Sequence, residues 1–232
     1  MMDQIRWSRG DRGRFPRLYP ILDAELVLRG VDADSDKRRN LLRRLVRELS
    51  DAGVEILQYR NKRDADAVVS ADALAMREAA GPNQMQLILN DRAALVNEAG
   101  WDGIHIGQDD LSPKQARLLV GSMAMVGFST HTDQQVIVAD AEPVDYIAIG
   151  PVFATASKFD TSPVIGLEGV RRASALTDKP LVAIGGITRE NAPAVYEAGA
   201  DSMAVISAIF GMGGRLGPSP AQSAKDFLEI FK

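Results

Sequence analysis

Three polar side chains occupy alternate positions at the end of the apolar run that starts at Val54. They are Gln58, Arg60 and Lys62. In a β-strand, residues two apart point to the same face. One amide and two cations would therefore project side by side from the carboxyl end of this strand, as a site for an anionic ligand requires. Taken alone, however, the two cations are more typical of solvated charges at a strand end than of a binding site.

Two carboxylates, Asp91 and Asp110, follow the next two apolar runs. Magnesium prefers oxygen ligands and keeps several waters while it binds substrate phosphates, so the pair could hold Mg²⁺ beside Arg60 and Lys62. Each carboxylate also has a structural interpretation. An Asx residue such as Asn90 or Asp91 before a helix is commonly its N-cap, and Asp110 could complement the dipole of the helix that begins near residue 112.

Small residues after the last two apolar runs indicate a second anion site. Gly185-Gly186 and Ser207 stand where backbone amides could hold a phosphate. The alternative for the glycine pair is a tight turn. Together with a further cation at Lys158, the two groups of residues predict two phosphorylated substrates, one of them a metal-bound diphosphate.

The remaining reactive side chains are few. The chain has no cysteine and only two histidines, which excludes disulfides, thiolate nucleophiles and thiolate metal sites. His105 lies inside a predicted strand, and we interpret it as a hydrogen-bonded core residue rather than a catalyst. His131 lies closer to the strand end, and its role stays open between helix entry and site lining.

Eight apolar runs rich in Val and Ile, each followed by a helix-like segment, must position these groups. The runs have the composition of parallel strands buried on both faces, and eight such units in 232 residues predict a (β/α)₈ TIM barrel. The predicted strands are Leu18 to Asp23, Val54 to Arg60, Gln86 to Asn90, Gly103 to Ile106, Met125 to Ser129, Asp145 to Ile149, Pro180 to Ile184 and Ser202 to Ile206.

Helices are predicted between the strands, and Gly53, Gly100 and Gly199 recur just before strands, where a glycine suits the left-handed residue that ends a helix. In such barrels the active site lies at the carboxyl ends of the strands. Candidate ligand groups follow seven of the eight predicted strands, all except the first. The predicted helices are Lys37 to Ala52, Ala65 to Ala80, Arg92 to Ala99, Ser112 to Val120, Asp133 to Ala139, Gly166 to Thr177, Asn191 to Ala198 and Pro220 to the C-terminus.

The bulk composition narrows the function classes. The net charge of −4 argues against a nucleic-acid-binding surface. No apolar stretch approaches the roughly 18 residues that would cross a bilayer, so we expect a cytoplasmic location and no membrane partner. Residues 1–17 read as an Arg-rich, poorly ordered N-terminal extension, and residues 18–232 as a single catalytic domain. The sequence leaves open whether the chain forms a homo-oligomer.

The motifs, taken in order, resemble those of the thiamine phosphate synthase family from about Leu18 to the C-terminus. The matching stretches are Gln58-Tyr59-Arg60-Asn61-Lys62, Asn90-Asp91-Arg92, Gly103 to Leu111, Gly150 to Phe153, Gly166 to Gly169, Ala183 to Ile187 and Val205 to Ala208.

This resemblance implies that a hydroxymethylpyrimidine diphosphate is joined to a thiazole phosphate, with release of pyrophosphate. The catalytic residues would be Arg60, Lys62, Ser129 and Lys158. Magnesium would be held by Asp91 and Asp110, because Asp109 occupies a variable position of its motif. The pyrimidine diphosphate would be bound by the segment Gln58, Tyr59, Arg60, Asn61 and Lys62 with Asn90, Ser129 and Lys158, although strand alternation directs Tyr59 away from the ligand. The thiazole phosphate would be bound by Thr155, Ala156, Ser157, Gly186, Ile206 and Ser207.

Two rival functions share parts of this pattern. A thiazole tautomerase type of barrel would share the phosphate loops but would not need Lys62, Lys158 and the two aspartates. A catalytically silent barrel that senses thiazole phosphate is the second rival. Turnover without a partner protein would separate such a sensor from an enzyme.

Overall fold

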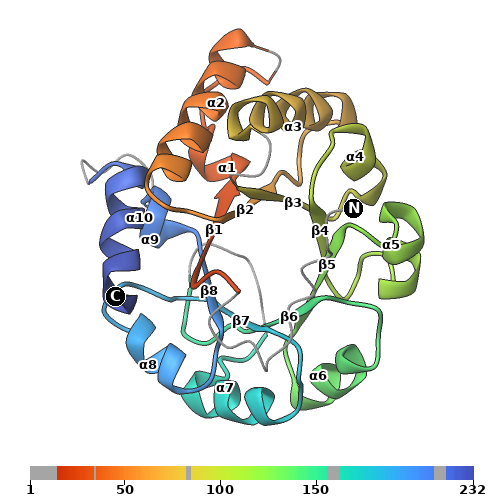
Figure 1. The fold of residues 1–232 in the computed structure, drawn as a ribbon, viewed down its shortest axis with the longest axis vertical. Helices are drawn as coiled ribbons and strands as arrows, with labels where there is room; N and C mark the ends of the chain where they lie inside the picture. The colour runs from red at the N-terminus through yellow and green to blue at the C-terminus, as the bar shows by residue number, and fades with distance from the viewer. Residues whose placement is uncertain (1–14, 34, 82–84, 156–161, 212–217) are drawn as a thin grey trace.

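The chain folds into a closed barrel of eight parallel strands in sequential order, with helices outside it. This confirms the TIM barrel predicted from the sequence. The computed structural model describes residues 15–33, 35–81, 85–155, 162–211 and 218–232. Figure 1 looks along the barrel, with the strands in the centre and the helices in a ring around them. The strands are β1 (Leu18–Asp23), β2 (Ile56–Arg60), β3 (Gln86–Asn90), β4 (Gly103–Ile106), β5 (Met125–Thr130), β6 (Tyr146–Ile149), β7 (Leu181–Ile184) and β8 (Ser202–Val205).

The predicted helices are all present, with ends within two residues of the prediction, except that the last helix ends at Leu228 and a 3-10 turn follows it where the helix was predicted to continue to the C-terminus. Three short elements accompany them: α1 directly after β1, α9 directly after β8, and a 3-10 turn (η2) at Glu229–Phe231. The helices are α1 (Ala24–Val27), α2 (Asp36–Asp51), α3 (Asp66–Ala80), α4 (Ala93–Glu98), α5 (Pro113–Val120), α6 (Asp133–Asp140), α7 (Gly166–Ala175), α8 (Ala192–Glu197), α9 (Ser207–Phe210) and α10 (Pro220–Leu228).

The strands are buried on both faces because each face has its own apolar core. One set of residues, including Ile56, Ile88 and Val182, packs inside the barrel. The alternate set, including Leu57 and Leu87, packs against the surrounding helices. This division follows from the two-residue period of a strand, and it explains why the strands read as continuous apolar runs instead of alternating ones.

The segment before β1 closes one part of the barrel interior. Phe15 is buried with 4% of its surface exposed, and its ring lies 5.4 Å from that of Tyr146. Arg17 accepts a backbone hydrogen bond from Met203. The sequence placed residues 1–17 in a poorly ordered extension. Residues 1–14 lie outside the described part of the chain, but Phe15 and Arg17 pack with the barrel and extend it by three residues.

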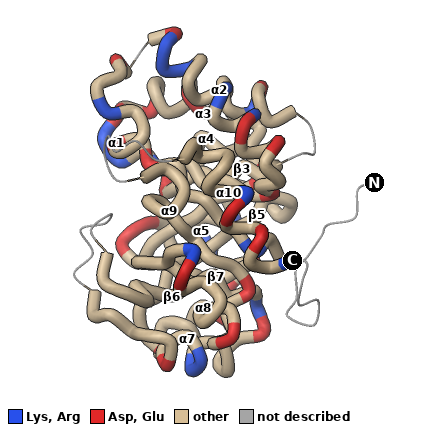
Figure 2. Tube along the Cα trace, turned by 90° about the vertical axis from the view of Figure 1, so that its left-hand side faces the viewer, with Lys and Arg blue, Asp and Glu red and all other residues tan. Residues whose placement is uncertain are grey.

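Charge is distributed without a single basic face in the view of Figure 2, where Lys and Arg alternate with Asp and Glu along the described helices. Many of these positions form ion pairs between neighbouring helices, such as Arg43 with Glu78 and Arg172 with Asp133. None of the described helices combines the length and the apolar composition needed to span a bilayer.

Candidate active site

The alternation predicted for the end of β2 is present. Gln58 is buried and donates through Nε2 to the Tyr19 hydroxyl at 3.2 Å, inside the barrel. Arg60 pairs with Asp23 at the end of β1, and Lys62 pairs with Asp91 after β3 at 3.0 Å. Arg60 and Lys62 therefore contact residues at strand ends on the carboxyl rim, and Gln58 contacts a neighbouring strand inside the barrel below them.

Tyr59 and Asn61, from the same segment, lie on the opposite face of the strand. The Tyr59 hydroxyl donates to Asp72 of α3 at 2.6 Å and accepts from Arg38 of α2 at 3.2 Å. Asn61 donates to the Tyr59 hydroxyl at 3.1 Å and to Asp64 at 2.9 Å. These two residues hold the β2–α3 connection from the helix side, so the structure does not bring them to the rim with the other members of their motif.

The two candidate metal ligands lie next to each other. Burial, and then the neighbouring Asp110 carboxylate, raise the pKa of Asp91, and Lys62 opposes the shift. Asp91 also has a φ of 66°, the only positive φ among the described non-glycine residues. Among the described residues, no group of three or more His, Asp or Glu side chains forms a metal site. The pair fits Mg²⁺, which is commonly held by one or two carboxylates together with substrate phosphates and water.

Helix capping does not account for either aspartate. The N-cap of α4 is Arg92, which makes no side-chain capping bond. The N-terminus of α5 is closed by a capping box between Ser112 and Gln115, while Asp110 accepts from the amide of Gly107 at 2.7 Å. Both carboxylates therefore belong to the loops at the rim, outside the helix caps.

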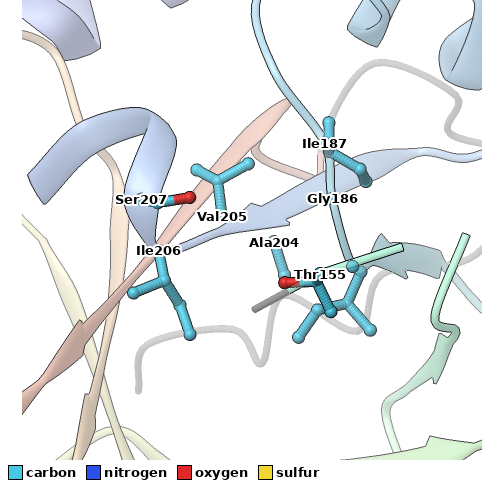
Figure 3. A pocket seen from close by; sticks show the side chains of 9 residues that line it. Thr155, Gly186, Ile187, Ala204, Val205, Ile206 and Ser207 are labelled. Atoms are coloured by element: carbon cyan, nitrogen blue, oxygen red, sulfur yellow. The ribbon is translucent and has the colours of Figure 1, made fainter. Parts of the chain in front are cut away.

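A second cluster lies across the barrel, where a pocket is lined by Thr155, Gly186, Ile206 and Ser207 together with neighbouring residues. Figure 3 shows these residues arriving from separate segments: Thr155 after β6, Gly186 after β7, and Ser207 at the start of α9. Of the other residues predicted for thiazole phosphate, Ala156 and Ser157 lie outside the described residues, as does Lys158.

The Gly185-Gly186 pair is required by close packing as well as by its turn. Gly186 has a φ of 64°, and a Cβ at this position would lie 2.6 Å from the carbonyl oxygen of Ala154. A Cβ on Gly185 would lie 2.7 Å from Pro151. The pair therefore makes the tight turn and also lines the pocket, and its role in holding a phosphate stays a prediction.

A line of hydrogen bonds crosses the barrel interior beneath the rim. The line begins with the bond from Gln58 to the Tyr19 hydroxyl, and this hydroxyl lies 2.8 Å from the hydroxyl of Tyr146. The Tyr146 hydroxyl is 2.9 Å from His105 Nδ1, and His105 Nε2 is 2.8 Å from Ser129 Oγ. His105 is buried, which confirms the sequence interpretation of a hydrogen-bonded core histidine. The line joins two predicted pyrimidine-site residues, Gln58 and Ser129, that lie on opposite sides of the barrel.

Room for this line comes from a missing side chain. A Cβ on Gly127 of β5 would lie 2.0 Å from the Tyr146 ring. Only glycine leaves space for the phenol at this position.

His131 and Asn90 occupy supporting positions at the rim. The His131 ring donates through Nδ1 to the carbonyl oxygen of Gly150 at 2.7 Å, and its amide donates to Gln135 at 2.7 Å. These bonds tie the end of β5 to the end of β6 and to α6, as helix entry requires. Asn90 is buried at the end of β3 and pairs in register with His105.

One rim residue escaped the sequence analysis. Asp23 ends β1, is 5% exposed, and pairs in register with Arg60. It was not singled out because no candidate group was assigned to the first strand. Its position at the carboxyl end of a strand could have identified it, because all the other candidates were chosen by that same criterion.

Comparison with known proteins agrees with this geometry. The thiamine monophosphate synthase family model, TMP-TENI, matches residues 30–209. The chain is 46% identical over 218 residues to the thiamine-phosphate synthase of Koribacter versatilis, covering 94% of this chain and 97% of that protein. It is 36% identical to a thiamine-phosphate synthase of a Synechococcus strain, covering 94% of this chain and 60% of that longer protein.

Among solved structures, the thiamine phosphate pyrophosphorylase of Pyrococcus furiosus superposes with a TM-score of 0.77. Its sequence is 26% identical, and the superposition covers 92% of this chain and 94% of that one. The similarity therefore extends over most of the barrel.

Proposed function

The chain belongs to the thiamine monophosphate synthase family, and from this membership we propose the substrates and residue roles of its reaction. It is a transferase with thiamine-phosphate synthase activity. The proposed substrates are hydroxymethylpyrimidine diphosphate and thiazole phosphate, and the products are thiamine phosphate and pyrophosphate.

The observation that carries the proposal is the presence of two unlike clusters at one rim. The first contains the cations Arg60 and Lys62 beside the carboxylates Asp91 and Asp110. Its donor set suits a diphosphate with its metal. The second is the glycine-rich pocket with hydroxyls from Thr155 and Ser207, which suits a single phosphate. Two phosphorylated substrates would thus be held on opposite sides of one cavity mouth.

The proposed chemistry needs no protein nucleophile. The bond between the pyrimidine methylene carbon and the diphosphate oxygen breaks, and the electron pair leaves with the diphosphate. The electron-rich aminopyrimidine stabilises the resulting carbocation, and the thiazole nitrogen then donates its lone pair to form the new carbon–nitrogen bond. Arg60, Lys62 and Lys158 would stabilise the charge that builds up on the leaving group, while Gln58, Asn90 and Ser129 would orient the pyrimidine.

Magnesium would be held by Asp91 and Asp110, which belong to loops after adjacent strands. When bound, it would neutralise part of the diphosphate charge and so make the leaving group better. Burial and the neighbouring Asp110 carboxylate raise the pKa of Asp91, and a bound cation would oppose both effects by favouring the ionised form of the pair. Lys62 supplies one positive charge to Asp91 at 3.0 Å.

The proposal is tested by incubating the purified chain with both phosphorylated substrates, with and without Mg²⁺. We expect thiamine phosphate and pyrophosphate in equal amounts when Mg²⁺ is present, and loss of turnover in excess chelator. Omission of either substrate is the control. Full activity in chelator would overturn the metal assignment, and no product under any condition would favour the tautomerase or sensor functions.

A further inference from the structure

The carboxyl end of β1 contributes a buried acid to the rim. The two inward-facing residues before it, Tyr19 and Ile21, belong to the interior core, so strand alternation also turns Asp23 inward. Asp23 pairs in register with Arg60 on β2. The two side chains thus lie in the same layer at the mouth of the barrel, with side-chain exposures of 7% for Asp23 and 15% for Arg60.

Both carboxylate oxygens of Asp23 are used, so its orientation is fixed. Oδ1 accepts from the amides of Glu25 at 3.0 Å and Leu26 at 3.3 Å, which makes Asp23 the N-cap of α1. Oδ2 forms the ion pair with Nη1 of Arg60. An uncharged Asn or Ser would cap the helix as well as Asp does. Capping therefore explains why an oxygen is needed at this position but not why it is charged. Among the described residues, Arg60 is the cation that pairs with this charge.

Arg60 retains donors beyond this ion pair. A guanidinium has five N–H groups in a fixed planar fork, and Asp23 engages Nη1. The Nε atom of Arg60 is buried and has no hydrogen-bond partner among the described residues. A free arginine side chain loses rotamer entropy when a ligand fixes it. Asp23 fixes the side chain in advance.

We propose that Asp23 is a positioning residue that holds the guanidinium of Arg60 in the orientation that binds the diphosphate. The inference rests on the role proposed above for Arg60, and it brings the first strand into the active site.

Whether loss of the Asp23 charge weakens or strengthens diphosphate binding distinguishes positioning from simple charge balance. A carboxylate beside an anion site repels the anion, so replacing Asp23 by a neutral residue would strengthen diphosphate binding if charge were its only contribution. If Asp23 positions Arg60, the same replacement weakens binding. Removing one member of a nearly buried ion pair also leaves the other charge uncompensated, which frees Arg60 to turn toward solvent.

The test uses Asp23→Asn, which keeps the capping oxygen and removes the charge. We expect kcat/KM for the pyrimidine diphosphate to fall by about tenfold or more, the effect of losing one well-placed interaction. The KM for thiazole phosphate should stay within about twofold, since that site is built on other strands. Calorimetry with inorganic pyrophosphate and Mg²⁺ should show weaker binding. Unchanged or tighter pyrophosphate binding would overturn the inference.

Two further variants control this result. Asp23→Ser repeats the test with another capping residue, should the Asn variant fail to fold. Glu25→Gln removes the adjacent carboxylate, which makes an exposed ion pair with Arg63 at 2.9 Å, and should leave all kinetic constants within about twofold.

A double-mutant cycle with Arg60→Ala identifies the route of the effect. We expect Asp23→Asn to cause no further loss when Arg60 is absent, because it acts through that side chain. An equal loss in both backgrounds would refute positioning. Wild-type kinetics in Arg60→Ala would instead remove the role proposed for Arg60, whereas an impaired Arg60→Ala beside a normal Asp23→Asn would remove only the present inference.

Discussion

Asp91 holds a backbone conformation that few residues other than glycine adopt, with a φ of 66°. Aspartate tolerates this region better than most side chains, but such residues cluster at functional sites, where the surrounding structure compensates for the strain. The conformation directs the carboxylate toward Lys62 and Asp110, and the α4 cap lies at the next residue. The local geometry therefore favours ligand binding over helix capping.

Replacing Asp91 by Ala should reduce turnover by about two to three orders of magnitude, comparable to the loss of one preorganised electrostatic group. The check is steady-state kinetics at saturating concentrations of both substrates across a magnesium titration. Gln134→Ala, at an exposed position of α6, is a control that should keep the wild-type rate. A wild-type rate in Asp91→Ala would show that this residue takes no part in the reaction.

The sequence predicted which residues of β2 turn inward, but the resemblance added neighbours that the structure places on the other face of the strand. Strand alternation correctly separates Gln58 and Arg60 from Tyr59, which bonds to α3 instead. Transfer of a whole motif by resemblance ignores this alternation, and it therefore included Tyr59 and Asn61. Asp23 was missed for the opposite reason, since no motif pointed to it.

A buried ionic cluster holds the connection between β2 and α3 on the side that faces the helices. Arg38 of α2 donates to both carboxylate oxygens of Asp72 on α3, at 3.1 Å and 2.7 Å, and also to Asp64 at 2.7 Å. Asp72 is 1% exposed and accepts from the Tyr59 hydroxyl as well. This cluster fixes the far face of the strand that carries Arg60, so loosening it should disturb the site as well as the fold.

Replacing Asp72 by Ala should lower the free energy of unfolding by about 3–5 kcal/mol, because it leaves the buried Arg38 without its main partner. Urea denaturation measures the change. Glu78→Gln is a matched control on the same pair of helices, where Glu78 pairs with Arg43 at an exposed position, and its effect should stay below about 1 kcal/mol. Similar losses in the two variants would contradict the importance assigned to the buried cluster.

The shortest helices are the elements that the sequence did not predict. Long helices such as α2 and α3 extend over enough residues to be recognised, and the sequence located them within a residue of each end. Helices α1 and α9 have four residues each, which is too short for a period of 3.6 to be recognised. Both follow directly on a strand at the rim, so the elements missed are those closest to the candidate site.

Part of the apolar interior of the barrel is filled by a residue that lies outside the eight strands. Phe15 packs on Tyr146, which in turn occupies the space left by Gly127. The fold class followed from the alternation of strands and helices, a property of the entire sequence. The docking of Phe15 did not, because one aromatic residue after an arginine-rich segment has no repeating pattern to mark it as core.

Phe15→Ala should lower the free energy of unfolding by about 3–5 kcal/mol, the usual cost of removing a buried phenylalanine ring. Thermal and urea unfolding check this value. Leu118→Ala is the control, because that side chain is 83% exposed and its loss should change stability by less than about 0.5 kcal/mol. Equal stability of Phe15→Ala and the wild type would return this residue to the extension predicted from the sequence.

The hydrogen-bonded line inside the barrel links Gln58 to Ser129 through His105, so the tautomer of a neutral His105 decides what Ser129 can do. Tyr19 and Tyr146 keep their protons because burial raises the pKa of each phenol. Gln58 donates to Tyr19 through its amide nitrogen and has its amide oxygen left to accept. If Tyr146 donates to His105 Nδ1, the imidazole hydrogen sits on Nε2 and goes to Ser129, which keeps its own hydroxyl hydrogen to donate; if Nδ1 donates to Tyr146, Nε2 accepts from Ser129. The tautomer of one buried histidine thus sets the hydrogen-bonding polarity of the barrel wall opposite Gln58 before any substrate arrives.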